Sequence, residues 1–529
     1  MTLNSFCKTL IASAAAFVVF AGLHDAEATQ VLRRGTVNEP RTLDPHYVQG
    51  NAGAAIMYDM FESLIGVGAK GEPEPGMAES WSISPDGKLY TFNLRPNLKW
   101  SDGKALTAED FVYSFRRAVN PKDAARAARV MFPIKNARAI VTGDMPTDAL
   151  AVKAVTPLKL TVELERPTPY FNELMISFSA APVPRHVIEK YGDAWTSPAN
   201  MVTNGAYKLA EFANNTHIKL VKNPLHYAAD KTAIDEVYFY PIEKPETALT
   251  RFRAGEIDIA YNVPSNRLDW VKENLAVEFK SSPVNGVYYI LLNNSKPELS
   301  DVRVRKALSL AVDRELITKG LIKTSDTPAY GIVPMAMPGY GDNSPAYANE
   351  PIAQRREEAK RLLAEAGYGP SKPLKINYKT GGQEVNRRIA VAIQSLWKQI
   401  GVEVEVENVG SSSIVADSNS GNFTAMRYSY FAAFEDAVSF LKLLETGGTI
   451  NFSRYSNPKF DKMLDEADQI LDPAKRLVLL REAEQLAMAD FPVIPVYFNY
   501  RYYLVSQRVQ GWTDNLRGEH LARFLSMKN

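Results

Sequence analysis

The sequence predicts an α/β fold divided into several domains. Short strands alternate with amphipathic helices along the chain, which is typical of sheets covered by helices. At 529 residues the chain is too long for one hydrophobic core, so two or three domains are expected. No low-complexity linker separates them. We therefore expect domains that move as hinged bodies rather than on a flexible tether.

The first 28 residues predict a cleaved export signal. Residues 10–23 form an apolar stretch that is too short for a membrane span, and Ala26-Glu27-Ala28 matches a small-x-small cleavage site. Cys7 is the only cysteine and precedes the apolar stretch, so no lipid anchor is expected. The alternative is a buried N-terminal helix that carries the cleavage pattern by accident. The mature chain is expected to begin near Thr29 and to be soluble and exported.

A hairpin followed by a helix is predicted within residues 78–121. Pro85-Asp86-Gly87 and Ser101-Asp102-Gly103 are turn signals, and apolar residues alternate with polar ones between them. Thr107 then precedes a helical run with Asp110 three residues later, a variant of the capping box. The residues predicted to face the core are Tyr90, Phe92, Leu94, Phe111, Ser114 and Phe115.

Two amphipathic helices that end at glycine are predicted farther along the chain. Residues 387–400 carry apolar side chains at helical spacing, and Gly401 ends that helix. Residues 402–406 then alternate valine with glutamate, as in a half-buried strand. A second helical stripe covers residues 359–366 and closes at Gly367. Such helix–turn–strand units are typical of an open sheet.

No catalytic, metal or cofactor motif supports an enzyme. Residues 66–71 match G-x-G-x-x-G, but prolines follow at once and exclude the helix that dinucleotide binding needs, so a turn is predicted. The histidines have no metal-ligand spacing, and neither a Walker A loop nor a G-x-S-x-G motif is present. The 61 basic and 60 acidic residues are nearly balanced, which gives no indication of nucleic-acid or membrane-surface binding.

Residues 78–121 resemble the signature of extracellular solute-binding proteins of family 5, the oligopeptide and dipeptide receptors of bacterial ABC importers. The likeness spans nearly the whole mature chain. It is closest in spacing to the periplasmic oligopeptide-binding proteins of Gram-negative bacteria. Further stretches that resemble family landmarks, in the same order, are residues 38–45, 203–209, 301–308, 454–461 and 494–497.

The resemblance implies a periplasmic binding protein of type II (class C), with three domains in two lobes hinged around a ligand cleft. Domain I would combine residues 29–61, 186–286 and 499–529. Domain II, which carries the signature, would be residues 62–185, and domain III residues 287–498.

Two extended segments, residues 287–290 and 495–498, are candidates for the strands that cross between the lobes. Both are rich in aromatic and β-branched residues. By themselves they indicate core strands, and only the resemblance makes them hinges. Closure of the lobes over a ligand would then present the closed form to membrane permeases driven by ATPase subunits.

The resemblance also implies where a ligand binds. A peptide would lie extended like an added strand, with its side chains in roomy, wet pockets. Arg427 would hold a carboxylate, and Tyr430 would form an aromatic wall. The predicted ligand-binding residues are Gln49, Gly50, Asn51, Asn386, Arg427, Ser429, Tyr430, Phe431, Ala432, Ala433 and Asn499.

Three positions depart from the family pattern. Ala433 stands where the family has an aspartate that pairs with the peptide's α-ammonium, and a buried ammonium without a counter-charge is costly. Either Glu435 or Asp436 substitutes from a shifted position, or the ligand has no free α-amino group there. The lysine that helps to hold the carboxylate is displaced by one residue, to Lys323, and Gln49 stands where the family has a glutamate.

The function predicted from the resemblance is the periplasmic substrate-binding component of an ABC importer for oligopeptides. A monomer without enzymatic activity, cofactor or metal is expected, with permease and ATPase subunits as partners. One alternative keeps this role for a modified peptide, a cell-wall peptide or an opine-like ligand. The alternatives from other classes are a secreted peptide hydrolase with a spatially assembled site and a periplasmic chaperone without a transporter.

Overall fold

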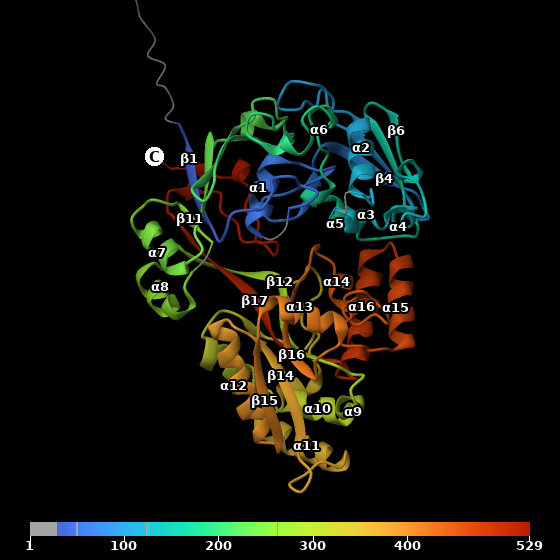
Figure 1. The fold of residues 1–529 in the computed structure, drawn as a ribbon, viewed down its shortest axis with the longest axis vertical. Coiled ribbons are helices and arrows are strands. Elements are labelled where there is room, and N and C mark those ends of the chain that lie inside the picture. The colour runs from blue at the N-terminus through green and yellow to red at the C-terminus, as the bar shows by residue number, and fades with distance from the viewer. Residues whose placement is uncertain (1–28, 49–50, 123–124, 126, 262, 529) are drawn as a thin grey trace, which may run out of the picture.

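The structure is a computed structural model that describes residues 29–528 except 49–50, 123–124, 126 and 262 (Figure 1). The predicted export signal and the predicted site residues Gln49 and Gly50 therefore lie outside the described residues, as does the side chain of Asn51. Within the described part of the chain, no helix combines the length and apolar character needed to cross a bilayer.

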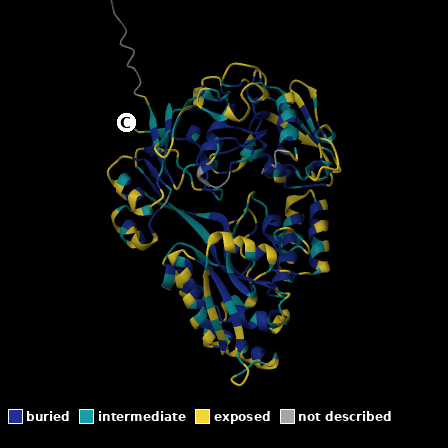
Figure 2. Cartoon of the chain, in the orientation of Figure 1, coloured by how far each residue is buried: buried dark blue, intermediate teal, exposed yellow. Residues whose placement is uncertain are grey.

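The chain forms two lobes joined by two long strands (Figure 1). We call residues 29–283 and 499–528 the upper lobe and residues 284–498 the lower lobe. Buried residues fill the interior of each lobe, and exposed residues cover the outer faces of the helices (Figure 2).

One mixed sheet runs through both lobes in the order β15-β14-β16-β12-β17-β11-β1-β10-β9-β8. In the upper lobe its strands are β1 (Val31–Thr36), β8 (Tyr207–Ala213), β9 (His217–Lys222), β10 (Glu236–Pro241) and β11 (Ile259–Ala260). In the lower lobe they are β14 (Leu374–Gly381), β15 (Val402–Val409) and β16 (Ala425–Phe431). The strands β12 (Phe279–Leu292) and β17 (Val493–Val505) belong to both lobes, and the short β13 (Thr327–Pro328) pairs with β17.

The antiparallel pair β12–β17 is the connection between the lobes. Residues 279–283 pair with 500–504 in the upper lobe, and residues 287–291 pair with 493–498 in the lower lobe. The register shifts between Pro283 and Val287. Both predicted crossing segments are therefore strands of this pair, on its lower-lobe side. The domain boundaries stay a prediction.

The upper lobe also contains a four-stranded sheet in the order β4-β5-β7-β6. Its strands are β4 (Ala78–Ile83), β5 (Leu89–Leu94), β6 (Val152–Thr156) and β7 (Lys159–Glu163). A separate hairpin consists of β2 (Ile65–Val67) and β3 (Pro73–Pro75), and a C-terminal pair consists of β18 (Val509–Gln510) and β19 (Ser526–Met527). The helices are α1 (Asn51–Met60), α2 (Ala108–Ala118), α3 (Ala128–Met131), α4 (Ala137–Val141), α5 (Phe171–Met175), α6 (Arg185–Tyr191), α7 (Pro245–Arg253) and α8 (Leu268–Asn274).

The predicted hairpin and capping box are both confirmed. The turn at residues 85–87 joins β4 to β5, with Gly87 at a φ of 70°. Thr107 and Asp110 form the reciprocal cap of α2, and the side chains predicted to face the core are buried. The G-x-G-x-x-G stretch forms the turn of the β2–β3 hairpin, as predicted.

The lower lobe follows the predicted helix–turn–strand pattern. Its helices are α9 (Pro297–Ser300), α10 (Val302–Leu310), α11 (Ile352–Glu365), α12 (Glu384–Lys398), α13 (Ser411–Ser420), α14 (Val438–Leu441), α15 (Pro458–Gln469) and α16 (Pro473–Met488). Helix α12 begins three residues before the predicted start, and Gly401 has the left-handed φ of 82° that a glycine turn allows. Strands β14, β15 and β16 run parallel, and α12 connects β14 to β15.

Candidate functional site

A pocket of about 740 Å³ lies at the carboxyl ends of two strands of the lower-lobe sheet. Strand β14 ends there at Gly381, β15 ends there at Val409, and the parallel strand β16 passes the pocket at Arg427. Ligands of open α/β sheets bind at the carboxyl ends of parallel strands. The topology thus places this pocket where a ligand site is expected.

Arg427 is the one charged residue that lines this pocket. Its guanidinium lies 5.6 Å from the ring centre of Tyr288, and its buried Nε has no hydrogen-bond partner. Among the described residues no carboxylate pairs with it. A planar guanidinium without an acidic partner is suited to a carboxylate brought by a ligand.

Two helices begin at the same pocket. Gln383 precedes α12 and Gly410 precedes α13, and neither helix has a side chain that caps its first turn. The first N–H groups of a helix have no partner within it, and the helix dipole is positive at that end. Both helix ends therefore add to the positive potential that Arg427 creates.

The structure brings Asn386, Arg427 and Ser429 together among the residues that line this pocket. Asn386 is buried in the first turn of α12, where its Nδ2 donates to Gln383 Oε1 at 3.3 Å. Tyr428, which belongs to the segment 427–433 that the resemblance implies as a strand partner of the peptide, also lines it, and so do the glycine junctions at the ends of β14 and β15, which were not predicted. A glycine between a predicted strand and the next helix was the signal available for these junctions.

The remaining described site residues lie near the hinge strands. Phe431 ends β16, is 51% exposed and pairs in register with Gly286 of β12. Its ring lies so close that a Cβ on Gly286 would be 2.5 Å from a ring carbon and 3.1 Å from Asn499 Oδ1. Tyr430 instead packs edge-on against Phe440 at 5.4 Å, and burial raises the pKa of Tyr430 to about 12. Phe431 is thus the more exposed aromatic ring.

The residues that follow β16 differ in exposure and in whether their side chains are paired. The Ala432 N–H donates to the Asn285 carbonyl at 2.9 Å, while Ala433 presents an exposed methyl group. Asp436 accepts two hydrogen bonds from Arg476, at 2.6 and 3.0 Å. Asp436 is therefore already paired within the lower lobe.

The carboxylate of Glu435 is bound less closely than that of the neighbouring Asp436. Its Oε1 is buried without a hydrogen-bond partner and lies 3.7 Å from Arg517 Nε. Burial raises the pKa of Glu435 to about 7, and Arg517 opposes this rise. Lys323 is exposed and does not line the pocket.

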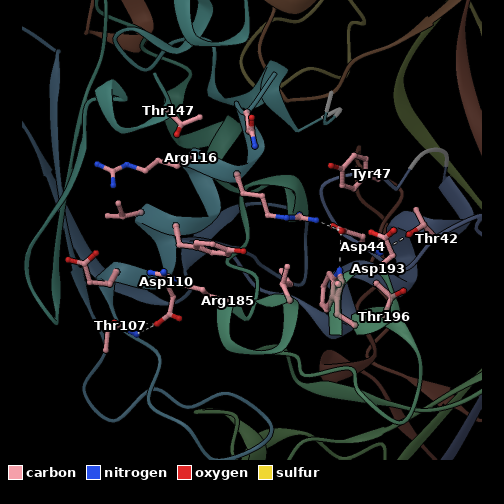
Figure 3. Close-up of a pocket in the computed structure, with 18 residues that line it drawn as sticks. Thr42, Asp44, Tyr47, Thr107, Asp110, Arg116, Thr147, Arg185, Asp193 and Thr196 are labelled. Atoms are coloured by element: carbon pink, nitrogen blue, oxygen red, sulfur yellow. Dashed lines mark hydrogen bonds and ion pairs between the residues drawn. The ribbon is translucent and has the colours of Figure 1, made fainter. Parts of the chain in front are cut away.

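A second pocket, of about 850 Å³, lies in the upper lobe between α2, the loop at residues 42–47 and residues 185–196 (Figure 3). Figure 3 shows Arg116 on one wall and Asp44 and Asp193 on the opposite wall. Asp44 is held by Arg117 at 2.6 Å and by Trp195 at 3.3 Å, so its charge is balanced by the protein. None of the predicted site residues lines this pocket.

A family model and curated relatives match most of the chain. Residues 72–452 match the family model described as bacterial extracellular solute-binding proteins, family 5 Middle. The periplasmic oligopeptide-binding protein OppA of Salmonella typhimurium is 36% identical over 526 residues, which cover 98% of this chain and 96% of OppA.

Two solved structures have the same fold. The murein tripeptide-binding protein MppA in its unliganded open form superposes with a TM-score of 0.84, at 34% identity, over 95% of this chain and 98% of MppA. The Haemophilus influenzae OppA complex with the peptide RPPGFSPFR superposes with a TM-score of 0.79, at 33% identity, over 95% of this chain and all of that one. Of these two structures, the unliganded open form has the higher TM-score.

Proposed function

Because the chain belongs to the bacterial extracellular solute-binding proteins of family 5, we propose that it is the periplasmic receptor of an ABC importer and binds oligopeptides between its lobes. The relatives that the chain matches include proteins named as periplasmic oligopeptide-binding and murein peptide-binding proteins, and one named as a probable deoxycholate-binding protein. After removal of its export signal it would act as a monomer in the periplasm and pass its ligand to permease subunits.

The observation that carries this proposal is the free edge of β16 beside an unpaired arginine. Strand β12 pairs with β16 over residues 425–431, whereas β14 pairs with its other edge only at Ala425 and Met426. From Arg427 to Phe431 no other strand of the described residues occupies that edge. An extended peptide can add there as a strand, with its backbone hydrogen-bonded to β16.

The position of the positive charge fits the end of such a peptide. Arg427 stands at the start of the free edge, next to the N-termini of α12 and α13. A carboxylate would therefore bind in the 740 Å³ pocket, while the peptide chain runs along β16 toward Phe431 and the hinge. Every group in this arrangement binds or positions the ligand, so we propose that the ligand leaves chemically unchanged.

The second candidate keeps the receptor role but changes the ligand to a modified or cell-wall peptide. Ala433 offers no charge, and Asp436 is occupied by Arg476. Glu435 is left as the acid that could meet an ammonium group, and Arg517 already lies beside it. Removing the amino group from the ligand would then cost little affinity.

Titration calorimetry with three- to five-residue peptides tests the proposal. We expect binding of unmodified peptides, and we expect Arg427→Met to weaken it at least about tenfold, since truncating one partner of a buried charge pair costs more than 1.4 kcal/mol. Arg361→Met is the matched control, because Arg361 is exposed on the outer helix α11 and pairs there with Glu358 and Glu365. Unchanged affinity of Arg427→Met would overturn the assignment of Arg427.

Further measurements separate the receptor role for unmodified peptides from its alternatives. N-acetylated peptides that bind while all free-amine peptides fail would favour the second candidate. Peptide fragments recovered by mass spectrometry would indicate a hydrolase. Normal peptide uptake by a strain without the gene would favour a chaperone role.

A further inference from the structure

The lobes also contact each other through side chains beside the hinge strands. Arg517 of the upper lobe reaches Glu435 of the lower lobe, and Tyr170 of the upper lobe contacts Phe434 and Lys442 of the lower lobe. We call these five residues the side bridge. Figure 1 shows α5 facing α14 and α16 on one side of β12 and β17. The side bridge is thus a second connection, displaced from the hinge.

Arg517 is fixed to the upper lobe by two strong contacts. Its Nε donates to the Gly71 carbonyl at 2.6 Å, and its Nη2 donates to Glu173 at 2.5 Å. The preceding residue, Leu516, accepts a hydrogen bond from the Asn285 N–H of the hinge strand at 3.1 Å. The Arg517 side chain is 8% exposed. Movement of the lower lobe therefore changes the distance from Glu435 to a guanidinium that stays in place.

The contact between Arg517 and Glu435 is incomplete in this arrangement. The closest approach is 3.7 Å, which is an ion pair without a hydrogen bond. Glu435 Oε1 is buried without a hydrogen-bond partner, and the guanidinium atom nearest to it, Arg517 Nε, already donates to the Gly71 carbonyl. A buried acceptor thus lies beside a guanidinium without bonding to it, which is costly for a buried group.

Tyr170 and Phe434 provide the other part of the side bridge. Their rings are stacked with centres 5.0 Å apart and planes 9° from parallel, and Lys442 Nζ lies 2.9 Å from the Tyr170 hydroxyl. Both rings belong to one apolar cluster that joins the two lobes. This stacking is a second contact between the lobes beside Arg517 and Glu435.

We propose that Arg517 is a positioning residue that favours lobe closure by completing its ion pair with Glu435 when the lobes close. The inference rests on the proposed ligand binding, because closure is driven by ligand contacts with both lobes. Arg517 would touch no ligand. It would raise ligand affinity by stabilising the closed state relative to the open one.

A double-mutant cycle on peptide binding tests this role. The variants are Arg517→Met, Glu435→Gln and their combination, measured by calorimetry at pH 8 with a peptide that the unaltered protein binds. We expect each single substitution to raise Kd about tenfold and the combination to raise it no further, because both remove the same pair. Arg517→Lys should recover part of the affinity. Small-angle scattering should show the same ligand-free dimensions for all variants.

Lys379→Met is the matched control. The Lys379–Asp417 pair has nearly the same burial as Arg517–Glu173, but both partners lie within the lower lobe. We expect this control to lower the unfolding temperature without changing Kd. An unchanged Kd for Arg517→Met, or single effects that simply multiply in the double variant, would overturn the inference and leave the receptor function standing. Failure of the unaltered protein to bind any peptide would overturn both.

Discussion

The ring of Phe431 lies against Gly286 on the adjacent strand, at a point where a single methyl group would overlap it. Gly286 sits in the register shift of β12, between the upper-lobe and lower-lobe pairings with β17. The smallest side chain therefore lets an aromatic ring rest on the hinge strand at the end of the free edge of β16. A ligand that follows this edge would meet the exposed face of that ring.

Gly286→Ala should weaken ligand binding more than it weakens the fold. A Cβ 2.5 Å from the ring must displace Phe431, but this side chain is 51% exposed and free to swing outward. We expect a stability loss of about 1 kcal/mol and a several-fold rise in peptide Kd. Gly369→Ala is the control, since nothing lies within 4 Å of its Cβ position. Equal binding by both variants would show that the ring position is irrelevant.

Gly205→Ala should instead destabilise the upper lobe strongly. A Cβ at Gly205 would lie 2.4 Å from the Met60 carbonyl carbon and 2.7 Å from the Asp59 carbonyl oxygen, which are backbone atoms that cannot swing aside. The Gly205 N–H also donates to the Met60 carbonyl at 2.8 Å. We expect a loss of roughly 3 kcal/mol, seen as a lower midpoint in urea unfolding. An unchanged midpoint would show that α1 can shift to make room.

The fold was predictable where short patterns decide the local structure. The alternation around Phe92 and the cap at Thr107 each depend on residues a few positions apart, and the structure contains both. The helix that ends before Gly401 followed from apolar spacing in the same way. Such local signals are strong because the periods of strands and helices differ.

The site was harder to predict from the sequence because its residues are brought together by the pairing of strands that lie far apart in the chain. Asn386 and Arg427 line one pocket only because β14 and β16 run parallel and α12 starts at the end of β14. The contact between Glu435 and Arg517 joins two loops from different lobes, and no local pattern marks either residue. Through a family resemblance the sequence could name Asn386, Arg427 and Glu435 as candidates, but not Arg517, and not the distances or partners of any of them.

Arg523→Met should be among the most destabilising substitutions near the C-terminus. Arg523 is buried and pairs with Glu62 and Glu74, each at 2.6 Å, so it holds the C-terminal segment on the β2–β3 hairpin. Although burial opposes it, Arg523 and His226 lower the pKa of Glu62 to about 2. Without the guanidinium, Glu62 would be a buried carboxylate whose described side-chain partners are the neutral Tyr227 hydroxyl and His226.

We expect this substitution to cost roughly 3–5 kcal/mol, the range for removing one partner of a buried pair. Urea unfolding at pH 7 measures the loss. The exposed pair Arg185–Glu189 supplies the control, because Arg185→Met should cost less than about 0.5 kcal/mol. Similar losses for the two variants would contradict a special role for the buried network.

Glu435 should make the stability of the protein depend on pH near neutrality. Burial raises its pKa to about 7, while the charge of Arg517 lowers it and the charges of Glu173 and Glu72 raise it. A carboxyl whose pKa is higher in the folded protein stabilises the fold below the unfolded value of about 4.5, and this stabilisation is lost as the pH rises through 7.

The measurement is the free energy of unfolding between pH 5 and pH 8 for the unaltered protein and for Glu435→Gln. Relative to the variant, the unaltered protein should lose up to about 3 kcal/mol over this range, since one pKa unit corresponds to about 1.4 kcal/mol. Glu519 and Asp59 also have raised pKa values, about 7 and about 6, but they titrate in both proteins, so the difference isolates Glu435. Parallel pH profiles would mean that Glu435 titrates like an exposed glutamate. The buried contact with Arg517 would then not persist in solution.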